Sequence, residues 1–349
     1  MKITVCGAGV SGSYIATRLI WKGYKVRIYD PLIKRGHRCA YGSHYKMLKE
    51  KLRNVFLDVD DYLLCKVKKV YLNDICIDIE DAIIIDKPRM LEEILPKDFI
   101  TPRKIKNIKK LSADLIINAT SDPLYPMNNE GIAVMPTLQY KTKLNTERET
   151  AWVYFNPKYL GYAWIFPLDD EGREFHVGAG SIGVPPLHLI KEMMKFYGFK
   201  LGIPKCACSR EIKMMDPEEI VIYEGKVVSV GESAGAVYPL TGEGTLPSMD
   251  SCDILFDALR NVETSSESDL GKALFYYASG WWNYLRKNEY DKAYKIVKFG
   301  VKHPKLAWIK GIKLLIKRVK IRTKPVFEMK KLLKVLSYFI KSPRVKGDE

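Results

Sequence analysis

The stretch GESAGAVYPLTGEGTLP, residues 231–247, carries four glycines between two segments with clear secondary-structure patterns. Before it, the apolar runs at 220–222 and 227–230 flank a Glu-Gly pair and predict a hairpin. After it, residues 248–262 have the spacing of a helix. The pattern predicts a strand, a glycine-rich loop and a helix N-terminus, where backbone N–H groups can approach an anionic ligand. An ordinary glycine-rich turn is the alternative.

The N-terminal stretch KITVCGAGVSGSYIATRLIWKGYKVRIYD, residues 2–30, predicts a strand, a turn, a helix and a second strand. In this pattern Gly7 makes the tight turn, Gly9 lets a pyrophosphate approach the backbone, and Gly12 lets the helix pack on the strand. Asp30 follows Gly12 by 18 residues, near the place where a carboxylate binds the ribose of an adenine nucleotide. The pattern predicts dinucleotide binding but does not distinguish NAD from FAD.

A third informative stretch, GYAWIFPLDDEGREFHVGAGSIG, occupies residues 161–183. Strict alternation places Tyr162, Trp164 and Phe166 on one face of a strand, and residues 169–172 form a turn. Three large aromatic residues on one face are also what an ordinary sheet core contains, so the alternation alone leaves their role open.

In their order along the chain, these three stretches resemble the geranylgeranyl reductase family of FAD enzymes. Residues 231–247 are similar to the family's GDAAG…PLTGEGI motif, and residues 162–180 to its YxWxFP…VGxG motif. The resemblance covers residues 1–262 and implies a p-hydroxybenzoate-hydroxylase-like fold of the α/β (α+β) class. In that fold a Rossmann-like FAD-binding domain is interleaved with an antiparallel-sheet substrate domain, here followed by a C-terminal helical tail.

The resemblance also implies domain boundaries. The FAD-binding domain is expected in residues 1–54, 84–125 and 215–262, and the substrate domain in residues 55–83 and 126–214. Residues 263–349 remain as a basic helical region. Apolar runs predict sheet segments over 55–86, a buried strand over 114–120 and an amphipathic helix over 188–199.

Cofactor contacts follow from the family's motifs. The acidic residue of the second motif, which meets the flavin's ribityl and pyrophosphate region, corresponds to Glu232, and the TGEG turn lies beside the isoalloxazine ring. The FAD contacts implied by the glycine motifs are Gly7, Gly9, Gly12, Asp30, Gly231, Glu232, Pro239, Gly242, Glu243 and Gly244.

Two further segments resemble cofactor-contacting segments of the family. Cys39-Ala40-Tyr41-Gly42 is similar to a CAxG segment that contributes a cysteine facing the flavin, so Cys39 and Ala40 are expected to contact FAD. Cys39 and Tyr41 are the candidate catalytic residues, and a flavin-bound water remains open as proton donor. The family's contacting arginine corresponds to Lys87 or Arg89, and we assign the contact to Arg89.

The activity implied by the resemblance is reduction of isolated C=C bonds in geranylgeranyl chains of archaeal-type lipids or their precursors. In the family, aromatic residues equivalent to Tyr162, Trp164 and Phe166 line the isoprenoid cavity. We expect an electron donor that the sequence does not identify, either reduced ferredoxin or NAD(P)H. A flavin monooxygenase of the same fold is an alternative. A non-catalytic, membrane-associated flavoprotein is another, because the family's Ala-x-Gly is replaced by Ala119-Thr120-Ser121 and the region before it is short.

Composition excludes several classes of protein. With 47% hydrophobic and 28% charged residues, the 349-residue chain is expected to form a large packed core. No uncharged apolar run is long enough for a transmembrane helix, and the N-terminus does not read as a signal peptide. Seven scattered cysteines favour a reducing compartment, and Cys206-Ala-Cys208 lacks a second pair, so we expect no metal site.

The net charge of +16 is concentrated at the C-terminus, where residues 301–349 contain 15 basic and 3 acidic residues. An anionic partner surface is therefore expected. Because no nucleic-acid-binding module accompanies the charge, we expect an anionic membrane rather than nucleic acid. The expected location is cytoplasmic, peripheral on the inner face of the cell membrane.

The tail also has helical periodicity over 308–320, and a second helix is predicted after Pro325. Its apolar face is expected to enter the acyl boundary while the basic face meets phosphates. The alternative is a helical pair that packs on the body of the protein. The apolar face comprises Trp308, Ile312, Leu315 and Val319, and the basic face Lys310, Lys313, Lys317 and Lys320.

Overall fold

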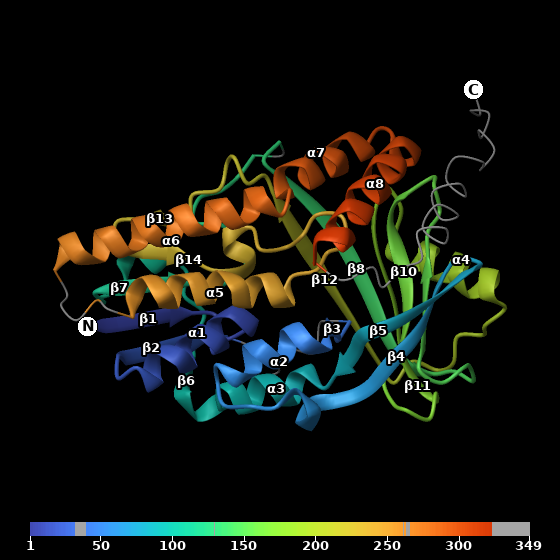
Figure 1. Cartoon of the computed structure of the whole chain (residues 1–349), viewed down its shortest axis with the longest axis horizontal. Coiled ribbons are helices and arrows are strands. Elements are labelled where there is room, and N and C mark those ends of the chain that lie inside the picture. The colour runs from blue at the N-terminus through green and yellow to red at the C-terminus, as the bar shows by residue number, and fades with distance from the viewer. Residues whose placement is uncertain (32–39, 129, 261, 263–265, 323–349) are drawn as a thin grey trace. The chain divides into compact units, whose positions relative to one another are not determined.

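The computed structural model describes residues 1–31, 40–128, 130–260, 262 and 266–322, except for the side chains of Glu267 and of residues 316–322 (Figure 1). The chain forms two compact units, each assembled from separate stretches. The first consists of Met1–Leu63, Ile85–Val134 and Ile212–Tyr294. The second consists of Leu64–Ile84, Met135–Glu211 and the described residues from Lys295 onward. The predicted interleaving of two units is confirmed.

The first unit contains a six-stranded sheet in the order β13-β14-β7-β1-β2-β6. Strand β1 is parallel to both of its neighbours, and β14 is parallel to β7. Such strands are buried on both sides, in agreement with their continuous apolar sequences. The strands are β1 (Lys2–Cys6), β2 (Lys25–Asp30), β6 (Ile100–Pro102), β7 (Leu115–Asn118), β13 (Tyr223–Glu224) and β14 (Val227–Ser229). The short strand β3 (Gly42–His44) lies in the first stretch of this unit but is not a strand of the six-stranded sheet.

The helices of the first unit are α1 (Val10–Trp21), α2 (Tyr45–Arg53), α3 (Lys87–Ile94), α5 (Thr245–Leu259), α6 (Glu267–Lys287) and the first part of α7 (Tyr290–Gly300). Figure 1 shows α6 running along α5. Helix α5 lies close to α1, where the Cys252 thiol donates a hydrogen bond to the carbonyl oxygen of Ser11 at 3.3 Å. An ionic cluster joins α1, α2 and α5, because Lys51 Nζ lies 2.6 Å from the carboxylate of Asp253, which also pairs with Arg18.

One expected strand is not formed. Residues 55–59, part of the predicted sheet segment, instead follow α2 as a turn that leads into a 3-10 helix at Val59–Tyr62. The physical reason is local. Asp58 caps that 3-10 helix by accepting a hydrogen bond from the N–H of Asp60 at 3.1 Å, and Phe56 adopts a φ of +53°, which no extended strand contains.

The second unit is built on a sheet in which the order of its strands is β12-β8-β11-β10-β9-β4-β5. Its central strands β8, β11, β10 and β9 are antiparallel, as predicted, and β9 is parallel to β4. The strands are β4 (Leu63–Leu72), β5 (Ile75–Ile85), β8 (Ile132–Lys143), β9 (Thr150–Tyr154), β10 (Leu160–Pro167), β11 (Glu174–Ile182) and β12 (Cys206–Met215).

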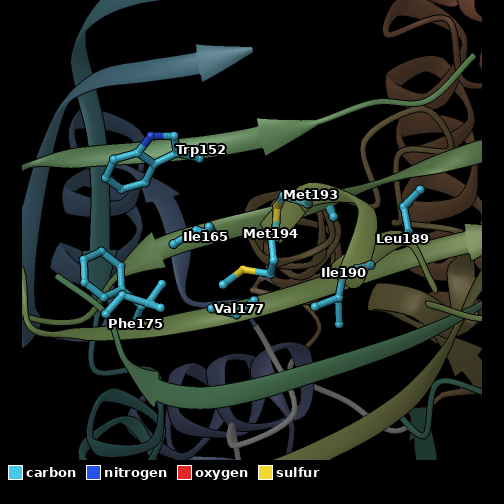
Figure 2. Packing of buried hydrophobic residues seen from close by; sticks show 11 residues of the cluster. Trp152, Ile165, Phe175, Val177, Leu189, Ile190, Met193 and Met194 are labelled. Atoms are coloured by element: carbon cyan, nitrogen blue, oxygen red, sulfur yellow. The ribbon is translucent and has the colours of Figure 1, made fainter. Parts of the chain in front are cut away.

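Helix α4 (Pro186–Tyr197) covers one face of this sheet. Its Leu189, Ile190 and Met193 are fully buried against Ile165 of β10 and Val177 of β11. Figure 2 shows these side chains gathered between the helix and the strands. Because side chains alternate along a strand, Trp164, which lies between the core residues Ala163 and Ile165 of β10, points to the opposite face.

Helix α8 (Pro304–Arg322) packs on the second unit through the face that carries Trp308 and Ile312. Both side chains are buried, with 7% and 6% of their surface exposed, against Phe155, Tyr162 and neighbouring apolar residues. The expectation that the Trp308 face enters an acyl layer is therefore wrong for this conformation, because the sheet already covers that face. The helix predicted after Pro325 lies outside the described residues.

Candidate functional site

The glycine-rich turn after β1 is shaped by two glycines that admit no side chain. Gly7 has a φ of +100°, and a Cβ added there would lie 2.2 Å from the carbonyl oxygen of Ala119 at the end of β7. A Cβ on Gly12 would lie 1.8 Å from the carbonyl oxygen of Gly7. These contacts let α1 start directly against two parallel strands, which is the packing that the sequence predicts.

Gly9 differs from these two glycines. Apart from Gly9 and its two chain neighbours, no heavy atom of the described residues lies within 4 Å of the position that a Cβ on Gly9 would take, and the residue is exposed. Gly9 precedes α1, whose first turn has no acidic residue and whose N-terminus is capped by no side chain of the described chain. The backbone therefore leaves an open cradle at the positive end of α1, which suits a phosphate group.

Asp30 lies at the end of β2 and is buried, with 7% of its surface exposed. Its Oδ2 accepts a hydrogen bond of 2.6 Å from the N–H of Ala8. This bond fixes the carboxylate beside the glycine-rich turn, where the sequence predicts a ribose contact.

The turn after β7 keeps a glycine-like backbone without a glycine. Ser121 has a φ of +72°, in the left-handed region that favours glycine. The side chain of Asn118 holds this turn, because it accepts from the hydroxyl of Thr120 at 2.7 Å and donates to the carbonyl of Asp122 at 2.9 Å. Ser121 therefore holds a backbone conformation that glycine adopts without strain.

The loop that opens the 231–247 stretch packs against the start of α1 and the turn after β7. Gly231 has a φ of +66°, and a Cβ there would lie 2.4 Å from Ser11 Oγ in α1. The hydroxyl of Ser233 donates to the carbonyl of Asn118 at 2.7 Å. The structure thus brings together three segments separated by over a hundred residues in sequence. Glu232 Oε1 accepts a 3.2 Å hydrogen bond from the N–H of Lys213, so its carboxylate is held by backbone.

The second half of the stretch forms a closed turn ahead of α5. The N–H of Tyr238 donates to the carbonyl of Glu243 at 2.8 Å, and the N–H of Gly242 donates to the carbonyl of Tyr238 at 2.9 Å. Gly242 has a φ of +66°, and the neighbouring Pro239 is buried. Gly244 then precedes α5, whose N-terminus lacks both an acidic first turn and, in the described chain, a side-chain cap.

A buried cation lies at that helix end. Lys87, the first residue of α3, has 7% of its surface exposed, and its Nζ donates to Thr245 Oγ1 at 2.9 Å. Arg89 is directed elsewhere, because its Nε donates to Glu93 Oε1 at 2.9 Å and its side chain is 57% exposed. Of the two cations that the sequence leaves open, Lys87 is the one beside the 241–245 turn, and our assignment to Arg89 gains no support from these contacts.

The proposed flavin-facing segment is described only in part. Cys39 lies outside the described residues, and Ala40 and Tyr41 are half-buried. Tyr41 has a φ of +67°, and its carbonyl accepts from the N–H of Ile85 at 3.2 Å. The backbone at Tyr41 is thus fixed near the start of α3.

Two cysteines next to the glycine motifs are structural. Burial raises the pKa of the Cys6 thiol to about 11, and it also raises the pKa of the Cys252 thiol. Both therefore stay protonated at neutral pH, and neither supplies a thiolate.

In the second unit, β10 presents the predicted aromatic row on the face opposite α4. The ring centroids of Tyr162 and Trp164 are 5.7 Å apart, and those of Trp164 and Phe166 are 6.3 Å apart. Trp164 Nε1 donates to Gln139 Oε1 at 3.3 Å. A Cβ on Gly178, which pairs with Trp164 across the strands, would lie 2.6 Å from the indole ring. Glycine at 178 therefore makes room for the indole to lie against β11.

Comparison with known proteins agrees with this architecture. No family model matches the chain. An uncharacterized protein of Methanocaldococcus jannaschii is 24% identical over 349 residues, covering 85% of this chain and 92% of that protein.

Among solved structures, a geranylgeranyl bacteriochlorophyll reductase-like protein of Thermoplasma acidophilum has a TM-score of 0.67 at 16% identity, covering 96% of this chain and 95% of its own. HpxO of Klebsiella pneumoniae, complexed with FAD and uric acid, has a TM-score of 0.63 at 14% identity, covering 98% and 97%. Both similarities extend over nearly the full chains. The protein therefore has the mixed α/β fold of FAD-dependent oxidoreductases, with a helical region at its C-terminal end.

Proposed function

We propose that the protein is an FAD-dependent reductase that saturates isolated C=C bonds of geranylgeranyl-type chains. The observation that supports this substrate is the row of Tyr162, Trp164 and Phe166, which lies on the sheet face opposite the packed core. The activity is that implied by the resemblance of the motifs. The similar fold of a geranylgeranyl bacteriochlorophyll reductase-like protein agrees with it.

The first unit has features that fit FAD. The open cradle at Gly9 and the uncapped start of α1 suit the pyrophosphate, and Asp30 is held beside them for the ribose. Lys87 supplies a buried positive charge where the 241–245 turn meets α5, a position suited to an anionic or electron-rich part of the cofactor. Two helix N-termini and one buried cation give a site that favours negative charge.

The aromatic row fits a hydrocarbon better than a polar substrate. Trp164 is 8% exposed, and its indole N–H is already bonded to Gln139. The row therefore offers rings but few hydrogen bonds, and a polar ligand placed on it would lose its bonds to water without replacement. An apolar chain loses nothing of that kind and gains burial.

The chemistry needs positioning more than activation. An isolated alkene has no carbonyl that an oxyanion hole could polarise, so alignment of the chain contributes most of what the protein can supply. Reduced FAD, when bound, supplies the hydride. The aromatic row orients the chain and excludes water. Cys39 and Tyr41 are our candidates for delivering the proton to the neighbouring carbon, and reduced ferredoxin or NAD(P)H for restoring the flavin.

Mass spectrometry tests this function directly. FAD-loaded protein reduced with dithionite is incubated with a lipid that carries geranylgeranyl chains, and the expected product gains two mass units per saturated bond. The matched control is a saturated phytanyl lipid, which should not change in mass. Unchanged geranylgeranyl lipid in the presence of reduced, protein-bound FAD would contradict the proposal.

A membrane partner is proposed as well, through a different face of the C-terminal helices than the sequence suggests. Val301 and Leu306 are 55% and 52% exposed, and Lys302, Lys310 and Lys313 are exposed around them. Apolar residues set among lysines suit the surface of an anionic bilayer. Within the described residues no helix has the length and apolarity needed to cross a bilayer.

Liposome flotation distinguishes the two faces of α8. Leu306→Glu should weaken flotation with anionic vesicles, and high salt should weaken it further, since binding depends on the lysines. Leu201→Glu, at a similarly exposed leucine outside these helices, is the control. Equal flotation of both variants and the wild type would remove α8 from the membrane contact.

A flavin monooxygenase remains the second candidate, because the fold is also similar to that of 2-methyl-3-hydroxypyridine-5-carboxylic acid oxygenase. An oxygen pulse after anaerobic reduction separates the two. A monooxygenase gives a hydroxylated product coupled to substrate, whereas a reductase gives saturated lipid before oxygen is added. A protein that releases no FAD on denaturation would be neither.

A further inference from the structure

A continuous series of aromatic contacts connects β10 to α8 within the second unit. The series begins with the Phe166, Trp164 and Tyr162 row and continues from Tyr162 to Phe155, whose ring centroids are 6.0 Å apart. Phe155 then meets Trp308 of α8 edge to face at 4.8 Å. The aromatic row on β10 is therefore connected, at its Tyr162 end, to Trp308 of helix α8.

Trp308 and Ile312 occupy the position beyond Tyr162. They form one apolar cluster, and Tyr162 and Phe155 pack against it together with Leu72. The indole N–H of Trp308 donates to the carbonyl of Tyr159 at 2.8 Å, immediately before β10. This bond is partly buried, so displacing the indole would break it where water has limited access to replace it.

The turn between α7 and α8 fixes the helix at this end of β10. A Cβ on Gly300 would lie 2.7 Å from Ala307 Cβ and 3.0 Å from the side chain of Leu160. A glycine is therefore needed for α8 to start so close to the first residue of β10. The position of Trp308 is held both by its own hydrogen bond and by the packing of this turn.

We propose that Trp308 and Ile312 form the end wall of the surface that holds the hydrocarbon chain, and that they set the longest isoprenoid accepted. The inference rests on the proposed function, because it extends the Tyr162, Trp164 and Phe166 row. A chain lying along this row meets the buried side chains of Trp308 and Ile312 beyond Tyr162. Each further isoprene unit must then bend away or stay in water, so its methyl and methylene groups add no burial.

The experiment measures binding and not turnover. Isothermal titration calorimetry uses prenyl alcohols from C10 to C30 below their micelle concentrations, with wild-type protein and the variants Trp308→Ala and Ile312→Ala. The affinity of the wild type should rise with chain length and then level off. In both variants the levelling point should move up by at least one isoprene unit. The affinity for the first alcohol beyond the wild-type limit should then rise about tenfold or more.

Two matched controls lie on the other face of the same sheet. Trp152→Ala and Ile165→Ala remove side chains of the same kinds, buried to a similar degree, from the core beneath α4. They should leave the levelling point where it is in the wild type. Ile312→Ala keeps the Trp308 bond to Tyr159, so it reports on the end wall even where Trp308→Ala lowers the yield of folded protein.

The outcomes separate the two proposals. An unchanged levelling point in both α8 variants, with wild-type-like binding of shorter alcohols, would overturn the end wall and leave the proposed function standing. A shift in the two controls as large as in the α8 variants would also overturn it. Absence of binding by the wild type at every chain length would reject the hydrocarbon surface itself, and with it both proposals.

Discussion

The ammonium group of Lys87 lies 2.9 Å from the hydroxyl oxygen of Thr245, so the first residue of α3 bonds to the first residue of α5. The two residues are 158 positions apart in sequence. Lysine is rarely this buried, and here it lies at the N-terminus of a helix, where the macrodipole is also positive. An arrangement of two positive groups is expected where an anionic or electron-rich ligand binds between or beside them.

Replacing Lys87 should weaken FAD binding more than folding. Lys87→Met keeps the apolar stem but removes the charge, and we expect a loss of about 10- to 100-fold in FAD affinity, in line with a charge-assisted hydrogen bond of about 1.5–3 kcal/mol. Arg89→Met is the control, because Arg89 is exposed and paired with Glu93. Flavin fluorescence titration of both variants measures the difference. A larger loss in the Arg89 variant would restore our first assignment.

Gly9→Val should remove FAD with little effect on the fold. The substitution fills the only open Cβ position among the three glycines of the first turn, and we expect at least a tenfold loss of bound flavin. Gly271→Val is matched to it, since Gly271 also has no heavy atom of the described chain within 4 Å of its Cβ position. Absorbance of the purified proteins near 450 nm gives the occupancy. Full occupancy in the Gly9 variant would show that the phosphate lies elsewhere.

Trp164→Ala should impair turnover of a geranylgeranyl lipid by tenfold or more while FAD occupancy stays near that of the wild type. The reason is that Trp164 belongs to the second unit, whereas the glycine motifs belong to the first. Gly178→Ala is a complementary variant, because its new Cβ would press on the indole and move it. Equal losses of turnover and flavin in both variants would mean that the row is only sheet core.

Ser121→Gly should stabilise the protein. Ser121 has a φ of +72°, and a left-handed backbone costs a non-glycine residue about 1–2 kcal/mol. The glycine variant removes this cost, so the free energy of unfolding should rise by about 1 kcal/mol after allowing for the greater freedom of glycine in the unfolded chain. Chemical denaturation measures the change. Ser121→Ala, which keeps a Cβ, should give no such gain, and a gain of equal size there would exclude backbone strain as the cause.

The second unit should lose stability in acid through Glu174. Hydrogen bonds from Lys205 and Lys141 lower the pKa of Glu174 to about 2, below its ordinary value of 4.5. The charged form is favoured in the folded protein, so this contribution is fully present above pH 4.5 and is lost as the pH falls through 2.

The size of that contribution should be about 1–2 kcal/mol, because the pair is partly exposed and therefore screened. Glu174→Gln should flatten the fall in unfolding free energy between these pH values, while Glu171→Gln, at a more exposed ion pair, should not. Parallel acid profiles for the wild type and the Glu174 variant would rule out this pair as a source of acid sensitivity.

The sequence by itself determined the features that depend on neighbouring residues. The tight turn at residues 7–12 follows from steric limits that act within a few residues, since a Cβ on Gly12 would lie 1.8 Å from the carbonyl oxygen of Gly7. The face shared by Tyr162, Trp164 and Phe166 follows from the period of a strand. Both features are local, so their patterns are readable before the chain is folded.

Only the tertiary structure decided which partner each face meets. Periodicity groups Trp308 with Ile312 but does not say that a sheet, and not a bilayer, covers them. The sequence also offers two candidate cations, Lys87 and Arg89, for the cofactor contact. The approach of α5 to the start of α3 places Lys87, not Arg89, beside Thr245. These outcomes depend on contacts between residues that are far apart along the chain, and no local pattern encodes the partner.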